Sequence, residues 1–229
     1  MPRKDEERMK LNKAELARYI ESVVLKPEAT RQEIITLCED AVKYNFMVAC
    51  MHGCYLPLAK SIVKGTPVRV MAPAGFPFGA NTTATKVFET KDSVKNGADE
   101  IDMMMFMGAF KDKLYDVVRD DIKAVVQAAE GRIVKVILET ALLSREEKIK
   151  ACQIAMEAGA HMVKTSTGNV FPGATVEDIK LMRQTVGPNF GVKASGGITK
   201  LEEVLAFIEA GATRVATRVA VEIIGSMKE

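Results

Sequence analysis

Strand-like and helical patterns alternate along this chain, and that alternation constrains the fold more than any other feature. Short apolar runs lie near residues 20–25, 46–51, 67–72, 99–106, 133–138, 160–165, 190–194 and 213–217. Amphipathic helical patterns separate them, such as Thr30 to Tyr44, where Ile34, Leu37 and Ala41 share one face. Regular alternation of this kind favours a parallel sheet with right-handed crossovers.

Eight β-α units are the number that closes into a TIM (β/α)8 barrel. A charged helical pattern at residues 11–19 precedes the first strand and predicts an extra N-terminal helix. No Ser/Gly-rich linker interrupts the sequence, so we expect one barrel domain over residues 1–229. The competing architecture is an open doubly wound sheet, which would have a Gly-x-Gly-x-x-Gly turn after an early strand, and the sequence contains no such turn.

Two lysines follow apolar runs, at positions where burying a charged side chain costs free energy. Lys164 ends the run His161-Met162-Val163, and Lys193 ends Gly191-Val192; a small, polar, Gly-containing turn follows each. In a barrel, the C-terminal ends of the strands carry the chemistry, and both lysines belong there. Burial or a neighbouring ammonium lowers the pKa of a lysine and leaves an amine that attacks carbonyls, which suggests Schiff-base chemistry. Alternatively, both stems pack while the ammonium groups reach water.

A lone carboxylate, Asp102, interrupts the apolar run Ile101 to Met107. A buried carboxylate is costly unless it is paired, and the two strand-end lysines are candidate partners. The residues alone leave two interpretations open, a catalytic group or a buried ion pair with no further role.

Charge and composition bear on the partners of this chain. Its 32 basic and 30 acidic residues give a net charge of +2, which offers no electrostatic reason to expect a nucleic-acid partner. No apolar run approaches the roughly 18 residues of a membrane span, and residues 1–8 lack the apolar segment of a signal peptide. We therefore expect a cytoplasmic protein without a membrane partner.

Four cysteines, Cys38, Cys50, Cys54 and Cys152, permit disulfides by number, but a chain of this size without an export signal usually keeps its thiols reduced. The segment Cys50 to Cys54 places two cysteines and His52 close together. With no matching cluster elsewhere, it is a weak metal signal, and we expect no metal.

The chain resembles the deoxyribose-phosphate aldolase family over nearly its whole length. The matching segments are Leu25-Lys26-Pro27, Gly75-Phe76-Pro77, Gly97 to Met103, Lys164 to Gly168, Gly173-Ala174-Thr175 and Val192 to Ile198. The resemblance implies a class I aldolase that joins acetaldehyde to an aldehyde acceptor through an enamine, with neither a metal nor an organic cofactor. It also suggests a homodimer with small-molecule aldehydes as its only other partners.

The resemblance also implies roles for individual residues. Lys164 would form the Schiff base, and Lys193 would lower its pKa by proximity. Asp102 would work with Lys193 and a water to move the protons of carbinolamine and enamine formation.

Several positions depart from the family pattern, and they cluster at strand ends. The usual Asp-His-Thr of the first strand is Glu21-Ser22-Val23, the Asn of the fourth strand is Phe106, and the usual Glu-Thr-Cys-Tyr is Glu139 to Leu142. These changes predict a reshaped and more apolar pocket. We expect its lining to include Glu21, Val23, Cys50, Phe76, Phe106, Glu139, Thr140, Leu142, Thr167, Gly168, Gly196, Gly197, Arg218 and Val219.

The eighth strand departs most. The family closes its phosphate site there with Gly-Thr-Ser-x-Gly, whereas this chain has Ala216-Thr217-Arg218-Val219-Ala220. Both glycines have gained a Cβ, so backbone access to phosphate oxygens is reduced. Arg218 either binds phosphate by charge or fills the phosphate position and pairs with a protein carboxylate, and we favour the second interpretation.

These features favour an enamine/iminium catalyst for unphosphorylated, more hydrophobic aldehydes, either a natural paralogue or an engineered variant. An iminium at Lys164 would also activate an enal for conjugate addition. The first alternative is ordinary cleavage of 2-deoxyribose 5-phosphate to acetaldehyde and glyceraldehyde 3-phosphate. The second is a catalytically silent binding barrel, which the persistence of Asp102, Lys164 and Lys193 disfavours.

Overall fold

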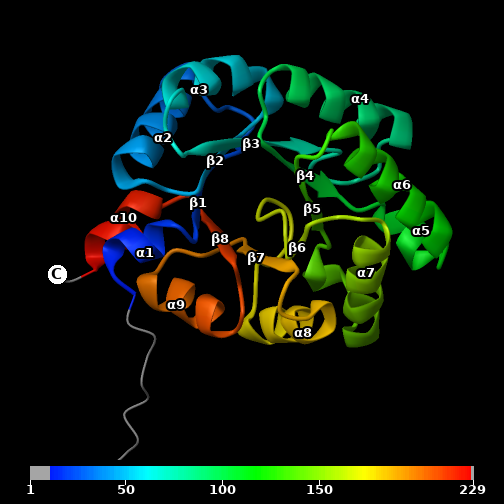
Figure 1. Ribbon diagram of the computed structural model, residues 1–229. Helices are drawn as coiled ribbons and strands as arrows, with labels where there is room; N and C mark the ends of the chain where they lie inside the picture. Colours follow the sequence, from blue (N-terminus) through cyan, green and yellow to red (C-terminus); the bar gives the residue numbers. More distant parts are fainter. Residues whose placement is uncertain (1–10, 228–229) are drawn as a thin grey trace, which may run out of the picture.

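The computed structural model describes residues 11–227, which form a closed barrel of eight parallel strands surrounded by helices (Figure 1). Each strand pairs with the next, and the eighth returns to the first. This confirms the predicted TIM (β/α)8 barrel. The strands are β1 (Ile20–Val24), β2 (Val48–Met51), β3 (Arg69–Ala74), β4 (Glu100–Met104), β5 (Ile133–Ile137), β6 (Met162–Lys164), β7 (Gly191–Ser195) and β8 (Arg214–Thr217).

Helices follow the strands around the barrel, and the expected N-terminal helix precedes β1. The α-helices are α1 (Lys13–Ala17), α2 (Arg31–Tyr44), α3 (Leu56–Val63), α4 (Thr83–Lys95), α5 (Met107–Lys111), α6 (Tyr115–Ala128), α7 (Arg145–Glu157), α8 (Val176–Val186), α9 (Leu201–Glu209) and α10 (Ala220–Ser226). Two short 3-10 helices, η1 (Gly53–Tyr55) and η2 (Thr140–Leu142), follow β2 and β5. No helix among the described residues is both long and apolar enough to cross a membrane.

Local sequence signals fix where the longer helices begin and end. The Ser144 side chain accepts a hydrogen bond from the Glu147 N–H at 3.2 Å, and the Glu147 carboxylate accepts one from the Ser144 N–H at 2.7 Å. This capping box satisfies N–H groups that the first turn of α7 leaves unpaired. Helix α2 ends at Asn45, whose left-handed conformation is one that asparagine tolerates well.

Two different interiors lie on the two sides of the strands. Between the strands and the helices lies an apolar core, because alternate strand residues point outward against the amphipathic helices. Inside the barrel, Val48, Cys50 and Met71 form a small apolar cluster on the β2–β3 side. The remaining interior is occupied largely by buried charged side chains from β1 and β4 to β7.

Pro73 stands in β3, where a proline is unusual because it has no N–H for the ladder. The β2–β3 register ends at Cys50 and Met71, whereas β3 continues to pair with β4 through Ala74. Pro73 therefore lies beyond the pairing with β2, at the end of the barrel where its missing N–H is tolerated.

Candidate active site

Three strands bring Asp102, Lys164 and Lys193 together inside the barrel. The Lys164 Nζ donates to Asp102 Oδ2 at 2.9 Å, and the Lys193 Nζ donates to the same oxygen at 2.8 Å. Lys164 and Lys193 are direct register partners on β6 and β7, so both side chains point to the same side of the sheet. All three side chains are at most 3% exposed. The residues that the sequence predicted to act together are therefore in contact.

A third lysine, which the sequence reasoning missed, belongs to the same cluster. Lys135 of β5 is fully buried, and its Nζ lies 3.0 Å from Asp102 Oδ1, 2.7 Å from Glu100 and 3.1 Å from Glu21. The signal was present, because Lys135 interrupts the apolar β-branched run Ile133 to Ile137 just as Asp102 interrupts its own strand.

Glu21, which we expected in the pocket lining, lies inside the barrel instead. Its side chain is fully buried and bonds to Lys193 and Lys135. The Cys50 thiol donates to Glu21 Oε2 at 3.4 Å. The carboxylate is directed inward because Glu21 occupies an inward-facing position of β1, where two buried ammonium groups offset its charge.

The charge pairs shift the proton affinities of the cluster in different directions. Burial is the main influence on Lys164 and lowers its pKa; the Lys193 cation lowers it further, and Asp102 acts in the opposite direction. For Lys193, burial is outweighed by Asp102 and Glu21, which raise its pKa. Burial also opposes ionisation of Asp102, but Lys135, Lys164 and Lys193 hold the pKa of this carboxyl well below its usual range. Lys164 is thus the lysine of this set whose amine is most readily neutral.

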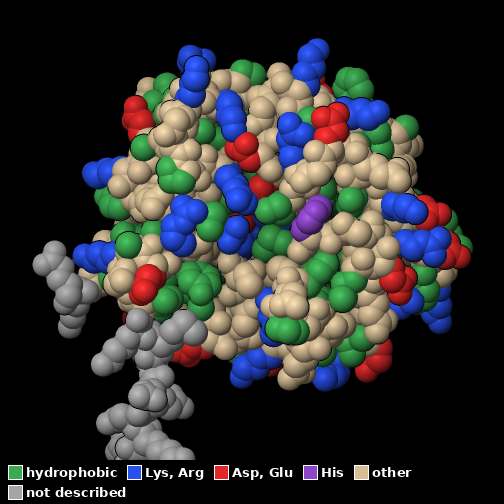
Figure 2. All heavy atoms as spheres, in the orientation of Figure 1, with side chains coloured by type: hydrophobic (Ala, Val, Ile, Leu, Met, Phe, Trp, Pro, Cys, Tyr) green, Lys and Arg blue, Asp and Glu red, His purple; other side chains and the backbone are tan. Residues whose placement is uncertain are grey.

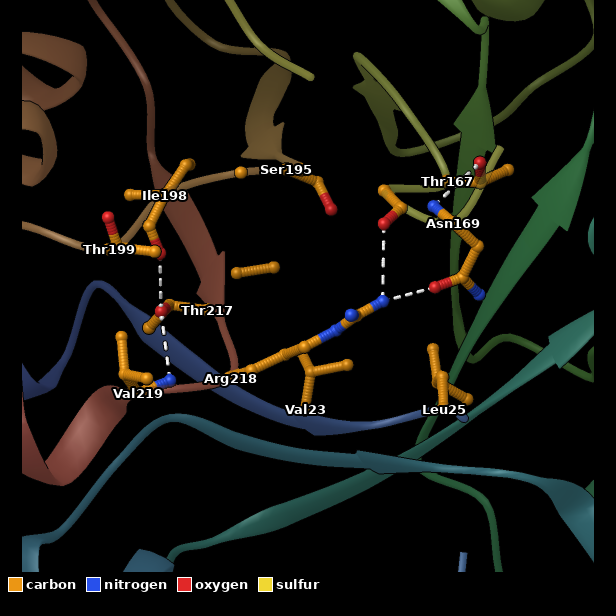
Figure 3. Close-up of a pocket in the computed structure, with 14 residues that line it drawn as sticks. Val23, Leu25, Thr167, Asn169, Ser195, Ile198, Thr199, Thr217, Arg218 and Val219 are labelled. Atoms are coloured by element: carbon orange, nitrogen blue, oxygen red, sulfur yellow. Dashed lines mark hydrogen bonds between the residues drawn. The ribbon is translucent and has the colours of Figure 1, made fainter. Parts of the chain in front are cut away.

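A pocket of about 200 Å³ lies at the C-terminal ends of β1, β6, β7 and β8 (Figure 3). Its lining includes seven of the predicted residues, namely Val23, Thr167, Gly168, Gly196, Gly197, Arg218 and Val219. Thr167 lies three residues after Lys164, and Ser195 two residues after Lys193, so the pocket adjoins the ends of the two strands that carry these lysines. Leu25, Asn169, Ser195, Ile198, Thr199, Ala216 and Thr217 also line it and were not predicted to do so.

Arg218 extends across this pocket rather than away from it (Figure 3). Its Nη2 donates to the Gly168 carbonyl at 3.2 Å and to the Asn169 side-chain oxygen. Among residues 11–227, no carboxylate forms an ion pair with it, so the expected pairing of Arg218 with a protein carboxylate is wrong. The guanidinium instead donates hydrogen bonds to these two neutral acceptors in the pocket lining.

Glycines at the pocket are required by close backbone packing. A Cβ on Gly173 would lie 1.9 Å from the Gly196 carbonyl oxygen, and one on Gly168 would lie 3.0 Å from the Gly196 Cα. Gly168 and Gly196 also have φ values of 74° and 95°, which favour glycine. The β6–α8 and β7–α9 turns therefore pack together only with glycine at these positions.

The remaining predicted residues lie around the pocket but not on its wall. Glu139 is buried with φ 51°, and its Oε2 accepts from the Thr167 hydroxyl at 2.6 Å and from the Thr167 N–H at 3.2 Å. It therefore orients a pocket residue. Thr140 and Leu142 belong to η2, beside it.

Phe76, Phe106 and Cys50 are also outside the pocket. Phe76 lines a second cavity of about 300 Å³ near Pro73 and Phe88. Phe106 precedes α5, with the Lys86 ammonium 5.7 Å from its ring centroid. Cys50 is fully buried, and burial raises the pKa of its thiol. Cys50, which we expected in the pocket lining, instead directs its side chain from β2 into the barrel interior.

Known proteins match the chain in sequence and in structure. The model of the DeoC/LacD family aldolases matches residues 10–224. A deoxyribose-phosphate aldolase from Streptococcus sanguinis is 55% identical over 94% of this chain and 96% of its own, and one from Macrococcus caseolyticus is 54% identical over 91% and 95%.

Solved structures also match the fold of this chain. The crystal structure of a protein assigned as a deoxyribose-phosphate aldolase from Coccidioides immitis matches with a TM-score of 0.91 and 38% identity, over 94% of this chain and 86% of that one. An aldolase named QR15 matches with a TM-score of 0.88 and 36% identity, over 92% and 94%.

Proposed function

The chain belongs to the DeoC/LacD aldolase family, among the class I deoxyribose-phosphate aldolases, and from this premise we propose that Lys164 forms the Schiff base that makes and breaks a carbon–carbon bond of aldehydes. The observation that carries the proposal is the position of Lys164. It ends β6 three residues before the pocket residue Thr167, it pairs with one carboxylate among the described residues, and burial lowers its pKa.

The reaction follows from this arrangement. The neutral Lys164 amine attacks the aldehyde carbonyl and forms a carbinolamine, which loses water to give an iminium ion. Lys193 and Asp102 lie next to the reacting nitrogen and move the protons of these steps. In the cleavage direction, the β-hydroxyl group loses its proton and becomes the carbonyl of the leaving aldehyde, while the iminium accepts the electron pair of the breaking carbon–carbon bond. One aldehyde leaves, and the resulting enamine is protonated and hydrolysed to release acetaldehyde and the free lysine.

We propose cleavage of 2-deoxyribose 5-phosphate to acetaldehyde and glyceraldehyde 3-phosphate as the reference activity, since the relatives are named deoxyribose-phosphate aldolases. Sodium borohydride with acetaldehyde should leave a reduced two-carbon adduct on Lys164, located by peptide mass spectrometry. Lys164→Ala should take up no adduct and show no turnover. An adduct on Lys193 in the wild-type enzyme, or an active Lys164→Ala, would refute the assignment.

A second candidate specificity is a preference for unphosphorylated, more hydrophobic acceptors, in aldol or conjugate addition. The observation that favours it is Arg218, which lies across the pocket and bonds to Gly168 and Asn169 where the family has a small phosphate-binding turn. A charge-assisted hydrogen bond contributes roughly 1.5–3 kcal/mol, so the loss of two lowers preference for a phosphorylated acceptor by about a hundredfold or more.

The test is the ratio of kcat/KM for glyceraldehyde 3-phosphate to that for glyceraldehyde. Replacing Ala216, Arg218, Val219 and Ala220 by Gly, Ser, Ser and Gly should raise this ratio. Arg218→Ala alone serves as the comparison variant. A high ratio in the wild-type enzyme that Arg218→Ala abolishes would make Arg218 the phosphate ligand and contradict the proposed preference.

A further inference from the structure

The three buried lysines share their carboxylate partners unequally. Lys135 contacts Glu21, Glu100 and Asp102, whereas Lys193 contacts Glu21 and Asp102. Among residues 11–227, the only carboxylate that pairs with Lys164 is Asp102. The number of anionic partners therefore falls from three for Lys135 to two for Lys193 and one for Lys164.

The number of carboxylate partners determines which ammonium group loses its proton first. A buried cation is stable only where nearby anions replace its hydration, so the lysine with the fewest carboxylate partners is the easiest to deprotonate. Asp102 stabilises the charges of Lys164 and Lys193 to a similar extent, because its Oδ2 lies 2.9 Å from the Lys164 Nζ and 2.8 Å from the Lys193 Nζ. The difference between the two lysines is Glu21.

The geometry points to Glu21 as a positioning residue that holds the proton on Lys193, so that the neutral amine forms on Lys164. This inference rests on the proposed function, in which Lys164 is the nucleophile. In that proposal a neutral amine on Lys193 would be unproductive, because it would leave the nucleophile Lys164 protonated.

The charged groups around Glu21 hold it in place for this role. Oε2 faces Lys193, while Oε1 lies 3.1 Å from Lys135 and 3.6 Å from Arg214 of β8. Burial opposes its ionisation, but Lys135 and Lys193 outweigh burial and hold the Glu21 pKa at about 2.

The other ionisable groups facing this cluster complete the charge balance. The Cys50 thiol of β2, whose pKa burial raises, is neutral and donates to the Glu21 carboxylate. On the far side of Lys135, Glu100 of β4 pairs with Arg69 of β3 at 2.9 Å. Glu100 does not contact Lys193, so it provides a matched comparison with Glu21.

The experiment compares Glu21→Gln with Glu100→Gln. Each removes one negative charge from Lys135, but only Glu21→Gln removes one from Lys193. An opposite charge within 4–6 Å changes the proton affinity of a group by roughly ten- to a thousandfold. We expect kcat/KM for 2-deoxyribose 5-phosphate on its pH plateau to be at least about tenfold lower in Glu21→Gln than in Glu100→Gln.

The pH profile separates this role from a structural one. Losing a negative charge makes the first lysine deprotonation easier, so the acidic limb of the Glu21→Gln profile should move to lower pH even as the plateau falls. A purely structural Glu21 would reduce the amount of folded enzyme without moving the limb. Equal plateaus and equal limbs in Glu21→Gln and Glu100→Gln would overturn the inference.

A measurement on the wild-type enzyme covers the case in which Glu21→Gln does not fold. With 15N-labelled lysine and signals assigned through Lys164→Arg and Lys193→Arg, the Lys164 Nζ should lose its proton at lower pH than the Lys193 Nζ. The reverse order would overturn the inference. Borohydride trapping on Lys164 tests the proposed function separately, because it depends on the nucleophile and not on which group holds the second proton.

Discussion

At the scale of single residues, the lowered pKa of Lys164 comes mainly from burial and only secondarily from Lys193. The sequence emphasised the neighbouring cation, whereas desolvation is the larger cause of the lowered Lys164 pKa. Asp102 opposes both effects, because it bonds to Lys164 at 2.9 Å. The pKa of Lys164, the proposed nucleophile, therefore depends on how Asp102 is shared between two lysines.

Replacing Lys193 by Met should slow the enzyme and move its pH optimum upward. The change removes a cation that lowers the Lys164 pKa and leaves Lys164 as the only strand-end lysine on Asp102 Oδ2, and both effects raise that pKa. A general acid or base contributes about 10²- to 10⁴-fold to rate, so a loss of kcat in that range is expected. Lys193→Arg, which keeps the charge, is the control. A pH optimum that stays in place in Lys193→Met would contradict this account.

Cys50 should resist alkylation by an α,β-unsaturated aldehyde, while Cys54 reacts. The reactive species is the thiolate, and burial raises the pKa of Cys50, whereas Cys54 is exposed. Mass spectrometry after enal exposure should find the adduct on Cys54, and Cys54→Ser should remove it. Modification of Cys50 in step with loss of activity would show that the barrel interior opens to the reagent.

At the scale of elements, a buried ion pair fixes α4 and α6 against the end of β4. The Lys86 Nζ lies 2.7 Å from Asp121 and donates to the Met104 carbonyl at 3.1 Å. Asp121 also accepts from the Thr83 hydroxyl at 2.8 Å. Because Met104 follows Asp102 by two residues, this pair supports the strand that carries Asp102.

Lys86→Met should lower the free energy of unfolding by about 3–5 kcal/mol, because it leaves Asp121 buried without a partner cation. The double variant Lys86→Met, Asp121→Leu should recover most of the loss, since replacing both members of a buried pair is often neutral. Urea unfolding at neutral pH measures both. A single variant that loses less than about 1 kcal/mol would mean that water or another group takes over the role of Lys86.

At the scale of the whole molecule, the charged side chains buried inside the barrel make the free energy of unfolding depend on pH in the acidic range. The Glu21 pKa is about 2 in the folded protein against an ordinary value of 4.5, so the unfolded chain binds more protons between these values. The stabilisation from Glu21 is therefore fully present above pH 4.5 and is lost as pH falls through about 2. Asp102, whose pKa is also lowered, acts in the same direction.

The free energy of unfolding should fall on acidification by roughly 3 kcal/mol from Glu21 alone, following the difference between its two pKa values. Glu21→Gln lacks this titration, so its unfolding free energy should fall less steeply than that of the wild-type protein between pH 4.5 and 2. Urea unfolding at several acidic pH values measures the two slopes. Parallel slopes would show that Glu21 does not carry this dependence.

Acidic and basic side chains are both scattered over the molecular face in Figure 2, in keeping with 32 basic and 30 acidic residues in the chain. The concentrated charge of this protein is instead inside the barrel, where Glu21, Glu100, Asp102, Lys135 and Lys193 are fully buried. The surface charges therefore give no indication of where the buried charged cluster lies.

The sequence by itself determined the barrel and identified the charged residues of its candidate site. Periodicity depends on neighbours along the chain, so eight strands could be located near their observed positions without knowledge of their partners. Lys164, Lys193 and Asp102 were identifiable because each interrupts or ends an apolar run. Burying a charged residue within an apolar run costs free energy, so a residue kept in such a place can be recognised from the sequence alone.

Only the tertiary structure determined which charged side chains pair with one another. Glu21 and Lys193 are 172 residues apart in sequence and meet because the barrel closes β8 onto β1. Register and closure also turn Cys50 inward and bring Arg218 to Asn169. Coulomb interactions depend on separations of a few ångströms in space, which the order of residues along the chain does not specify. The protonation pattern of the three lysines therefore belongs to the folded barrel.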